Sequence, residues 1–196
     1  IGVGQAAVAA GARLHEHSRV TQIEHGPTVT VRTDKGSVRA RFVTLCANVG
    51  HEELSARLAR RSIGVASYVV ATKPLGPERA GALLRDRIAV ADLNWIIDYY
   101  RVSSDHRMLF GGRVSYSGVD PLGTARATRQ RMLNVFPQLA DVEIDYAWGG
   151  MIDITMSRLP NFGRLEPNVY YLQGYSGHGM VATTIAGKIA AEAIEI

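Results

Sequence analysis

Apolar residues recur along the chain at two different spacings, so the sequence predicts both strands and helices. Period-two alternation or continuous apolar runs predict strands at residues 12–16, 18–24, 29–33, 37–47, 65–72, 88–102, 107–114, 142–148 and 169–173. Helical spacing or runs of small residues predict helices at residues 5–10, 51–61, 124–136 and 180–194. Gly11 is placed to end the first of these helices, and Pro137 the third.

Two of the predicted strands form a hairpin. Residues 29–33 alternate, Asp34-Lys35-Gly36 supplies a tight turn, and residues 37–47 return as the second arm. The second arm is continuously apolar from Phe42 to Ala47, as expected of a strand buried on both faces. Its Cys46 is therefore expected to be a buried thiol.

Composition changes along the chain and predicts its domains. Residues 1–50 and 149–196 carry buried strands, glycine-rich turns and small-residue helices, whereas residues 51–148 are richer in aromatic and charged residues. This pattern predicts a mixed α/β and α+β fold. A partial Rossmann-like, nucleotide-type domain is built from both ends and interrupted by an antiparallel-sheet substrate domain.

Overall composition narrows the classes of function. The 196 residues are 46% apolar and 20% charged, with a formal net charge of +4, which is typical of a globular protein. The longest basic run is Arg60-Arg61, and no zinc-finger, RRM or KH signature is present, so a slightly basic surface is favoured over nucleic-acid binding. No apolar run approaches the ~18 residues of a membrane span. One cysteine fits a reducing, cytoplasmic compartment, and we expect neither nucleic acid nor membrane as a partner.

The most informative motif is a glycine-rich turn between a predicted strand and a predicted helix, Gly174-Tyr175-Ser176-Gly177-His178-Gly179-Met180. Its glycines let the backbone approach a ligand closely, and the following helix begins with free N–H groups and a positive dipole end. Such a terminus stabilises negative charge, which a reduced flavin carries around N1 and the C2 carbonyl. The motif suits an isoalloxazine ring, although a purely structural turn has the same spacing.

Residues 157–164 and 168–179 together resemble the C-terminal signature of the D-amino-acid-oxidase-like flavoproteins, most closely the gamma-glutamylputrescine oxidoreductase branch. The resemblance continues upstream at Asp98-Tyr99-Tyr100-Arg101, Phe110-Gly111-Gly112-Arg113 and Trp148-Gly149-Gly150. It implies FAD bound in a Rossmann-like domain. No cysteine lies near Met156 for a covalent bond, so FAD is expected to bind non-covalently.

The resemblance assigns cofactor residues position by position. Val20 matches a strand whose backbone meets adenine. The strand end that passes the diphosphate matches Cys46, Ala47 and Asn48. Loops along the flavin edge match Gly149, Gly150 and Pro160, and the flavin-facing turn matches Gly174, Tyr175, Ser176, Gly177, His178, Gly179 and Met180. Structural roles, as a hairpin residue, a strand end or turn glycines, remain the alternative for each.

The nucleotide fingerprint expected near the family's N-terminus is not found. Residues 2–7 mimic G-x-G-x-x-A, but no strand precedes them, and the acidic residue expected about twenty positions further on is at best Glu24. These residues are better interpreted as opening the helix before the hairpin. The chain also begins at Ile1 without an initiator Met, so we expect a C-terminal fragment. Such a fragment exposes apolar surface, which favours self-association.

Two departures from the family bear on the substrate. Val181 stands where the sarcosine-oxidase branch has a lysine near the flavin, so the helix terminus alone would stabilise the reduced ring. Residues 150–153 lack the arginine that binds a substrate carboxylate in the amino-acid-oxidising branch. This favours an amine over a free α-amino acid, and a polyamine derivative is one such amine. Tyr99, Tyr100 and Trp148 are candidate substrate residues, with a core role as the alternative for the tyrosine pair.

The resulting hypothesis is oxidation of an amine C–N bond by hydride transfer to flavin. No general base is required if the amine binds neutral, so no catalytic residue is assigned. The alternative is a catalytically silent fragment, or a ligand- or partner-binding domain that does not hold FAD by itself. No metal site is expected, because His15, His17 and His25 have no cysteine or carboxylate to complete one.

Overall fold

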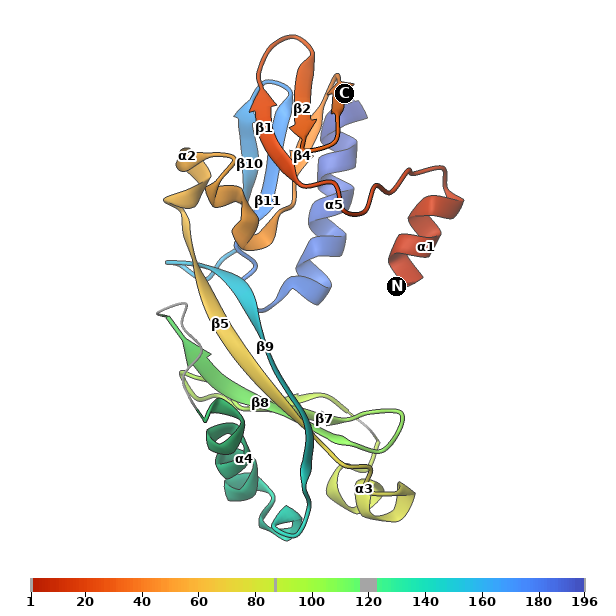
Figure 1. Ribbon diagram of the computed structural model, residues 1–196, viewed down its shortest axis with the longest axis vertical. Coiled ribbons are helices and arrows are strands. Elements are labelled where there is room, and N and C mark those ends of the chain that lie inside the picture. The colour runs from red at the N-terminus through yellow and green to blue at the C-terminus, as the bar shows by residue number, and fades with distance from the viewer. Residues whose placement is uncertain (1, 87, 117–122, 196) are drawn as a thin grey trace. The chain divides into compact units, whose positions relative to one another are not determined.

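The computed structural model describes residues 2–86, 88–116 and 123–195, which form two compact units (Figure 1). Unit 1 comprises residues 1–61, 160–174 and 178–196, and unit 2 comprises residues 62–159 and 175–177. The domain boundaries predicted from composition, after residues 50 and 148, differ from these limits. The fold class is confirmed, because helices combine with largely antiparallel sheets.

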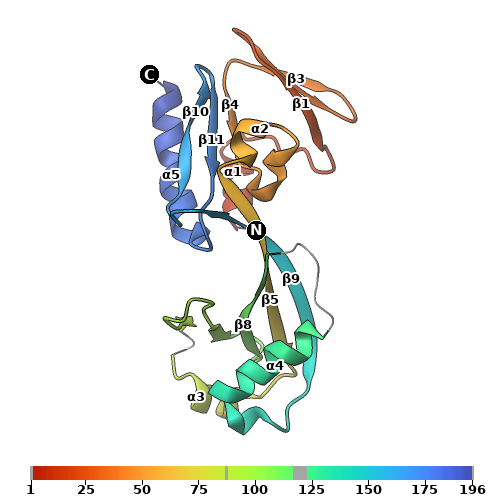
Figure 2. The same ribbon diagram turned by 90° about the vertical axis from the view of Figure 1, so that its left-hand side faces the viewer.

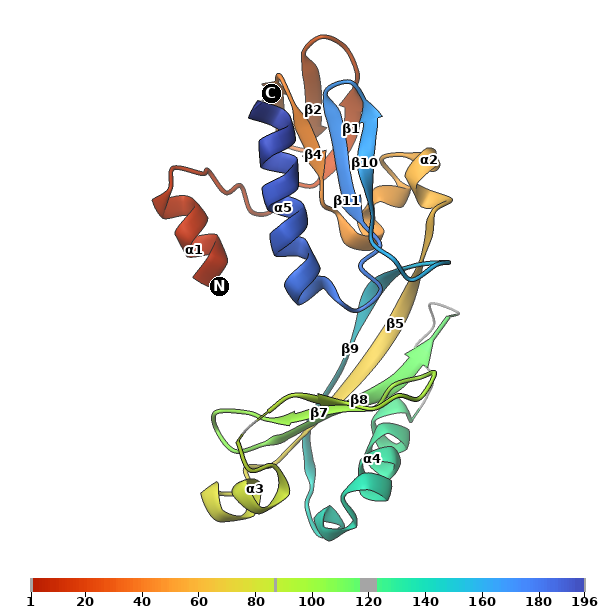
Figure 3. The ribbon, with the colours of Figure 1, turned by 180° about the vertical axis from the view of Figure 1, so that it is seen from behind.

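The first sheet of unit 1 has the strand order β10-β11-β4, and helix α5 runs alongside it (Figure 3). These elements are β4 (Val43–Leu45), β10 (Asn161–Glu166), β11 (Val169–Gln173) and α5 (Gly179–Glu195). β11 is buried along its whole length, because it is the central strand. It pairs antiparallel with β10 and parallel with β4, where Val169 is the partner of Val43. The predicted strand at 169–173 and helix at 180–194 are both present.

The second sheet of unit 1 corrects the predicted hairpin. Its strands are β1 (Val20–Glu24), β2 (Val29–Thr33) and β3 (Ser37–Ala40), in that order. The turn after β2 is as predicted, but the second arm ends at Ala40 instead of continuing to Ala47. The chain then leaves for the other sheet, because β11 offers β4 a backbone partner there. Phe42 and Cys46 are exposed, so the prediction of a strand buried on both faces was wrong for them.

Short helices complete unit 1. They are α1 (Gly2–Ala9), the 3-10 helix η1 (Asn48–Glu52) and α2 (Ala56–Ala59), and the last two replace the single helix predicted over residues 51–61. No strand forms at residues 12–16. The core joins both sheets to α2 through the buried side chains of Val29, Leu45, Leu58, Val169 and Tyr171.

Unit 2 is an antiparallel sheet with the order β6-β7-β8-β5-β9, and α4 lies across one of its faces (Figure 2). The strands are β5 (Ser62–Thr72), β6 (Val90–Ala91), β7 (Tyr99–Val102), β8 (Met108–Ser115) and β9 (Ile144–Thr155). The helices are α3 (Pro77–Leu83), α4 (Thr124–Val135) and the 3-10 helix η2 (Pro137–Leu139). Val70, Phe110 and Met132 form the centre of its core.

Two strand predictions change in unit 2. The strand predicted over 88–102 is interrupted by a loop at residues 92–98, because the Asp92 carboxylate accepts hydrogen bonds from the N–H groups of Asn94 and Asp98, each at 3.0 Å. β9 continues past Trp148 to Thr155, because β5 pairs with it along its whole length.

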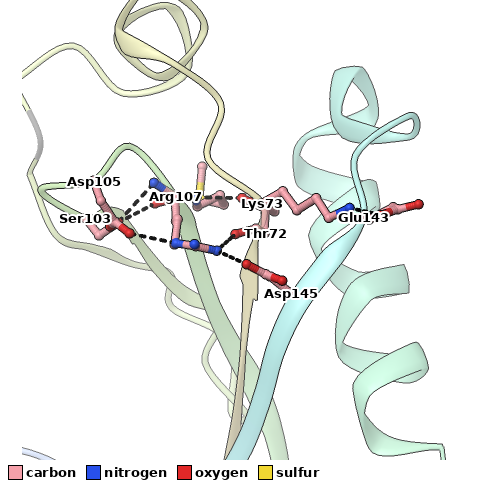
Figure 4. Close-up of polar contacts among 8 residues, drawn as sticks. Thr72, Lys73, Ser103, Asp105, Arg107, Glu143 and Asp145 are labelled. Atoms are coloured by element: carbon pink, nitrogen blue, oxygen red, sulfur yellow. Dashed lines mark hydrogen bonds and ion pairs between the residues drawn. The ribbon is translucent and has the colours of Figure 1, made fainter.

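One end of this sheet is held by a polar network around Arg107 (Figure 4). Arg107 Nη1 donates to the Thr72 carbonyl at 2.9 Å, and Nε donates to the Asp105 carboxylate at 2.7 Å. The guanidinium also pairs with Asp145 on β9. The Met108 N–H donates to Thr72 Oγ1 at 3.0 Å. The network therefore ties β5, β8 and β9 together where the sheet ends.

Candidate functional site

The glycine-rich turn joins β11 to α5 through left-handed backbone. Gly174, Ser176 and Gly177 have φ angles of 69°, 52° and 87°, which glycine adopts at little cost and serine rarely adopts. Two hydrogen bonds hold Ser176 in place. Its N–H donates to the Asp153 carbonyl at 3.0 Å, and its Oγ accepts from the Thr155 N–H at 3.3 Å. The end of β9 therefore fixes the conformation of the turn.

Open space adjoins the turn where α5 begins. A Cβ built on Gly177 would meet nothing within 4 Å, and Met180 is 93% exposed at the start of the helix. His178 is also exposed. The first N–H groups of a helix carry partial positive charge. An exposed helix end of positive charge suits a ligand that gains negative charge, such as the flavin of FAD.

Unit 1 contains a cavity of about 620 Å³ beside β1 and β4. Three of the sequence-predicted cofactor residues line it together, Val20, Cys46 and Ala47. The fourth residue of that group, Asn48, begins η1 with a φ of 51°. The volume falls in the usual range for ligand pockets, roughly 300–1,000 Å³. The cavity fits the nucleoside part of a cofactor in size.

Arg19 and Glu53 form an ion pair at this cavity. Arg19 Nη2 lies 2.6 and 2.5 Å from the two carboxylate oxygens of Glu53. The side chains are 71% and 66% exposed. The hydrogen bond to Glu53, and then its negative charge, raise the pKa of Arg19 above its ordinary value. An ion pair as exposed as this one contributes little to stability.

Tyr99 lies on the face of the unit 2 sheet opposite the core. Its ring covers Gly111, where an added Cβ would be 2.2 Å from Tyr99 Cζ. Its hydroxyl lies 3.0 Å from Ser67 Oγ on β5. Because side chains alternate along a strand, Arg101 shares this face with Tyr99. We call Ser67, Tyr99, Arg101 and Gly111 the Tyr99 face.

Of the other two candidate substrate residues, Tyr100 lies on the opposite face. Tyr100 points into the core, where its ring stacks on Phe110 with centroids 5.6 Å apart and meets the Phe136 ring at 5.0 Å. Trp148 is the partner of Val69 on β5 and lines a small pocket of about 190 Å³ that includes residues of α4. Because Trp148 is two residues from Gly150, the partner of Ser67, it lies on the same sheet face as Tyr99, and only Tyr100 is separated from that face.

Gly149 and Gly150 lie inside β9, where the sequence predicts a loop. Gly149 is the partner of Tyr68, and a Cβ on it would be 2.8 Å from the Tyr68 ring. This glycine makes room for an aromatic side chain. Gly150 is the partner of Ser67 and has nothing within 4 Å of a built Cβ. Pro160 is exposed and directly precedes β10.

Two residues of these surfaces, Glu53 and Ser67, were not identified from the sequence. Glu53 stands in a charged stretch that predicts only a helix. Ser67 interrupts an apolar strand, which is a weak signal for a buried or functional hydroxyl. Both become informative only when tertiary contacts bring them to Arg19 and Tyr99.

Comparison with known proteins identifies relatives along nearly the whole chain. The family model described as DAO, FAD dependent oxidoreductase, matches residues 1–193. The chain is 43% identical over 183 residues to gamma-glutamylputrescine oxidoreductase of Escherichia coli, and 39% identical over 199 residues to the probable oxidoreductase OrdL of Haemophilus influenzae. These matches cover 93% and 99% of this chain but 43% and 45% of the relatives. The chain thus spans less than half the length of these relatives.

Solved structures share its fold. Glycine oxidase from Geobacillus kaustophilus superposes with a TM-score of 0.81 at 22% identity, covering 97% of this chain and 51% of that one. The L-proline dehydrogenase from P. horikoshii gives a TM-score of 0.78 at 22% identity, covering 96% of this chain and 52% of that one.

Two kinds of feature are absent from the described part of the chain. None of its helices is both long and apolar enough to cross a membrane. No group of three or more His, Cys, Asp or Glu side chains within residues 2–86, 88–116 and 123–195 is arranged to hold a metal ion.

Proposed function

This chain belongs to the DAO family of FAD-dependent oxidoreductases, and from that premise we propose that it supplies cofactor- and substrate-binding parts of an amine oxidoreductase. The observation that carries the proposal is the path from β11 to α5. Its left-handed residues lead directly into a helix start beside open space. This backbone brings partial positive charge to a ligand without a charged side chain.

In this proposal FAD binds without a covalent bond. Val20, Cys46, Ala47 and Asn48 hold its adenosine side, and Gly174 to Met180 hold the flavin side. FAD supplies the acceptor for the hydride removed from the amine. The helix start stabilises the resulting negative charge through its partial positive charge. Val181 offers no cation there, so the helix start acts alone. Gly149 acts through packing, since its lack of a side chain accommodates the Tyr68 ring.

The Tyr99 face is the proposed surface for the amine. The Ser67 and Tyr99 hydroxyls can each donate and accept hydrogen bonds, so together they suit a neutral amine. No general base is assigned, because a neutral amine has already lost its proton. This surface binds and orients the amine while the cofactor carries the redox chemistry.

A carboxylate at the far end of the substrate fits the same face. Arg101 follows Tyr99 by two residues, which is about 7 Å along a strand. The relative named gamma-glutamylputrescine oxidoreductase supports an amine of this kind, a polyamine derivative carrying a carboxylate. A substrate with both groups would place its amine at Tyr99 and its carboxylate at Arg101.

Visible absorbance tests the proposal directly. The purified chain is mixed with FAD, freed of unbound cofactor and examined for a flavin spectrum. Anaerobic addition of a gamma-glutamylated diamine is expected to bleach the bound flavin, and glycine is expected to bleach it more slowly. The alternative is a domain that binds a ligand or partner without FAD. A chain that stays colourless after FAD treatment would support that alternative.

A further inference from the structure

The unit 1 cavity has mainly apolar walls from two different sheets. Ile23 and Val31 contribute from the β1-β2-β3 sheet, and Val43 contributes from β4. Such walls suit a flat, weakly polar heterocycle better than a sugar or a phosphate. Among the described residues that line the cavity, Arg19 and Glu53 alone carry charged side chains. The pair therefore provides the cavity's distinctive chemistry.

The ion pair holds a flat cation beside the cavity. Both carboxylate oxygens of Glu53 lie within 2.6 Å of one Arg19 nitrogen. A guanidinium is planar and weakly hydrated, and nucleic-acid bases stack on its plane. The pair is too exposed to add much stability, but it places a planar cation at the edge of an apolar cavity.

We propose that Arg19, held by Glu53, is the stacking surface for the adenine ring of the cofactor. This assignment rests on the proposed binding of FAD and adds a specific role for two side chains. Adenine enters the apolar cavity with one face on the guanidinium, and Glu53 holds the guanidinium beside the cavity. Arg19 thus determines how much the adenosine half contributes to cofactor affinity.

The same sheet provides a matched control. Arg32 and Glu24 also form a fixed pair, with Arg32 Nε and Nη2 at 2.6 and 3.1 Å from the carboxylate oxygens. Their side chains are 50% and 39% exposed. Neither residue lines the cavity. Arg32→Ala removes the same charge from an exposed ion pair but leaves the proposed stacking surface intact.

The test compares FAD with FMN, which lacks the adenosine half. Dissociation constants of both are measured by flavin fluorescence titration for the wild-type chain and for Arg19→Ala, Arg19→Lys, Glu53→Gln and Arg32→Ala. We expect both Arg19 variants to weaken FAD binding roughly tenfold while FMN binding changes little. Lysine keeps the charge but has no plane to stack on. Arg32→Ala is expected to stay within about twofold of wild type.

The outcomes separate the two proposals. If the wild-type chain binds neither flavin, the proposed cofactor binding fails, and this inference fails with it. If FAD binds but Arg19→Ala or Arg19→Lys retains wild-type affinity, adenine stacking is excluded while the proposed function stands. An equal loss of FAD and FMN binding also contradicts stacking, because FMN has no adenine. Urea unfolding of each variant checks that the fold is retained.

Discussion

The Asp98 carboxylate, just before β7, fills the space that a side chain on Gly112 of β8 would need. A Cβ built on Gly112 would lie 2.1 Å from Asp98 Oδ1 and 3.3 Å from Asp98 Cα. The Asp98 side chain is buried, and it accepts a hydrogen bond from Arg131 Nε of α4 at 2.6 Å. The glycine on β8 therefore leaves room for the Asp98 carboxylate to lie over the sheet and reach the helix that covers the core.

Gly112→Ala is expected to destabilise unit 2 by about 2–4 kcal/mol, because the methyl group displaces the carboxylate and weakens a largely buried ion pair. Urea-induced unfolding followed by circular dichroism measures the change. Gly150→Ala is the matched control in the same sheet, since open space surrounds its Cβ position. Unfolding midpoints that are equal for the two variants would contradict the interpretation that Asp98 fills the space beside Gly112.

Acid is expected to loosen the network around Arg107. The hydrogen bond from Ser103, followed by that from Arg107, holds the pKa of Asp105 below its ordinary value of 3.8. A lowered folded-state pKa means that these contacts contribute stability above the ordinary pKa. That contribution is lost as the pH falls through the folded-state value. The urea midpoint of wild type should therefore drop below about pH 4.

The variant Asp105→Asn isolates this effect. It should unfold at lower urea than wild type at neutral pH, and the difference between the two should shrink in acid. Asp34→Asn, in the turn between β2 and β3, controls for the loss of one negative charge. A constant difference between Asp105→Asn and wild type at every pH would show that the carboxylate's ionisation is irrelevant.

Gly177→Ala tests the left-handed turn. A non-glycine residue at its φ of 87° costs about 1–2 kcal/mol, so the turn should shift and FAD affinity should fall roughly tenfold. Gly177→Asn should lose less, because asparagine tolerates left-handed backbone better. Gly187→Ala within α5 has open space at its Cβ position and serves as the control. Flavin fluorescence titration gives the dissociation constants.

Arg101→Gln tests the proposed carboxylate subsite. In the flavin-loaded protein, KM for an amine with a distal carboxylate should rise about tenfold, because a charge-assisted hydrogen bond is lost. KM for a simple diamine should stay unchanged, since it has no carboxylate to bind. Arg39→Gln on β3 removes the same charge from unit 1 as a control. Equal changes for the two amines would remove Arg101 from substrate recognition.

Patterns within short stretches of sequence correctly predicted several helices and strands. The helix over residues 124–136 has apolar spacing that Met132 satisfies by packing on the sheet, and it forms as α4. The apolar run at 169–173 becomes β11 because it is central and buried. The glycine-rich turn lies between that strand and α5, as its sequence position predicts.

Contacts between residues far apart in the sequence determine the features that the sequence did not predict. The chain breaks after Ala40 because β4 pairs with β11, which lies far along the sequence. Alternation predicts that Tyr99 and Tyr100 point to opposite faces, but Phe110 and Phe136 determine which of them enters the core. Glu53 belongs to the cavity through its contact with Arg19. No spacing within residues 51–61 signals that contact.

The parallel pairing of β4 with β11 sets an order of assembly during synthesis. The pairing of Val43 with Val169 cannot form until Val169 has left the ribosome. By contrast, β5 to β9 of unit 2 are contiguous in the sequence and emerge earlier. Because domains generally fold as units while the chain emerges, unit 2 should acquire its structure first. Until then, β4 lacks its β11 partner, and an unpaired strand is the kind of segment that associates with other chains. Slow synthesis between residues 46 and 169 would prolong that exposure.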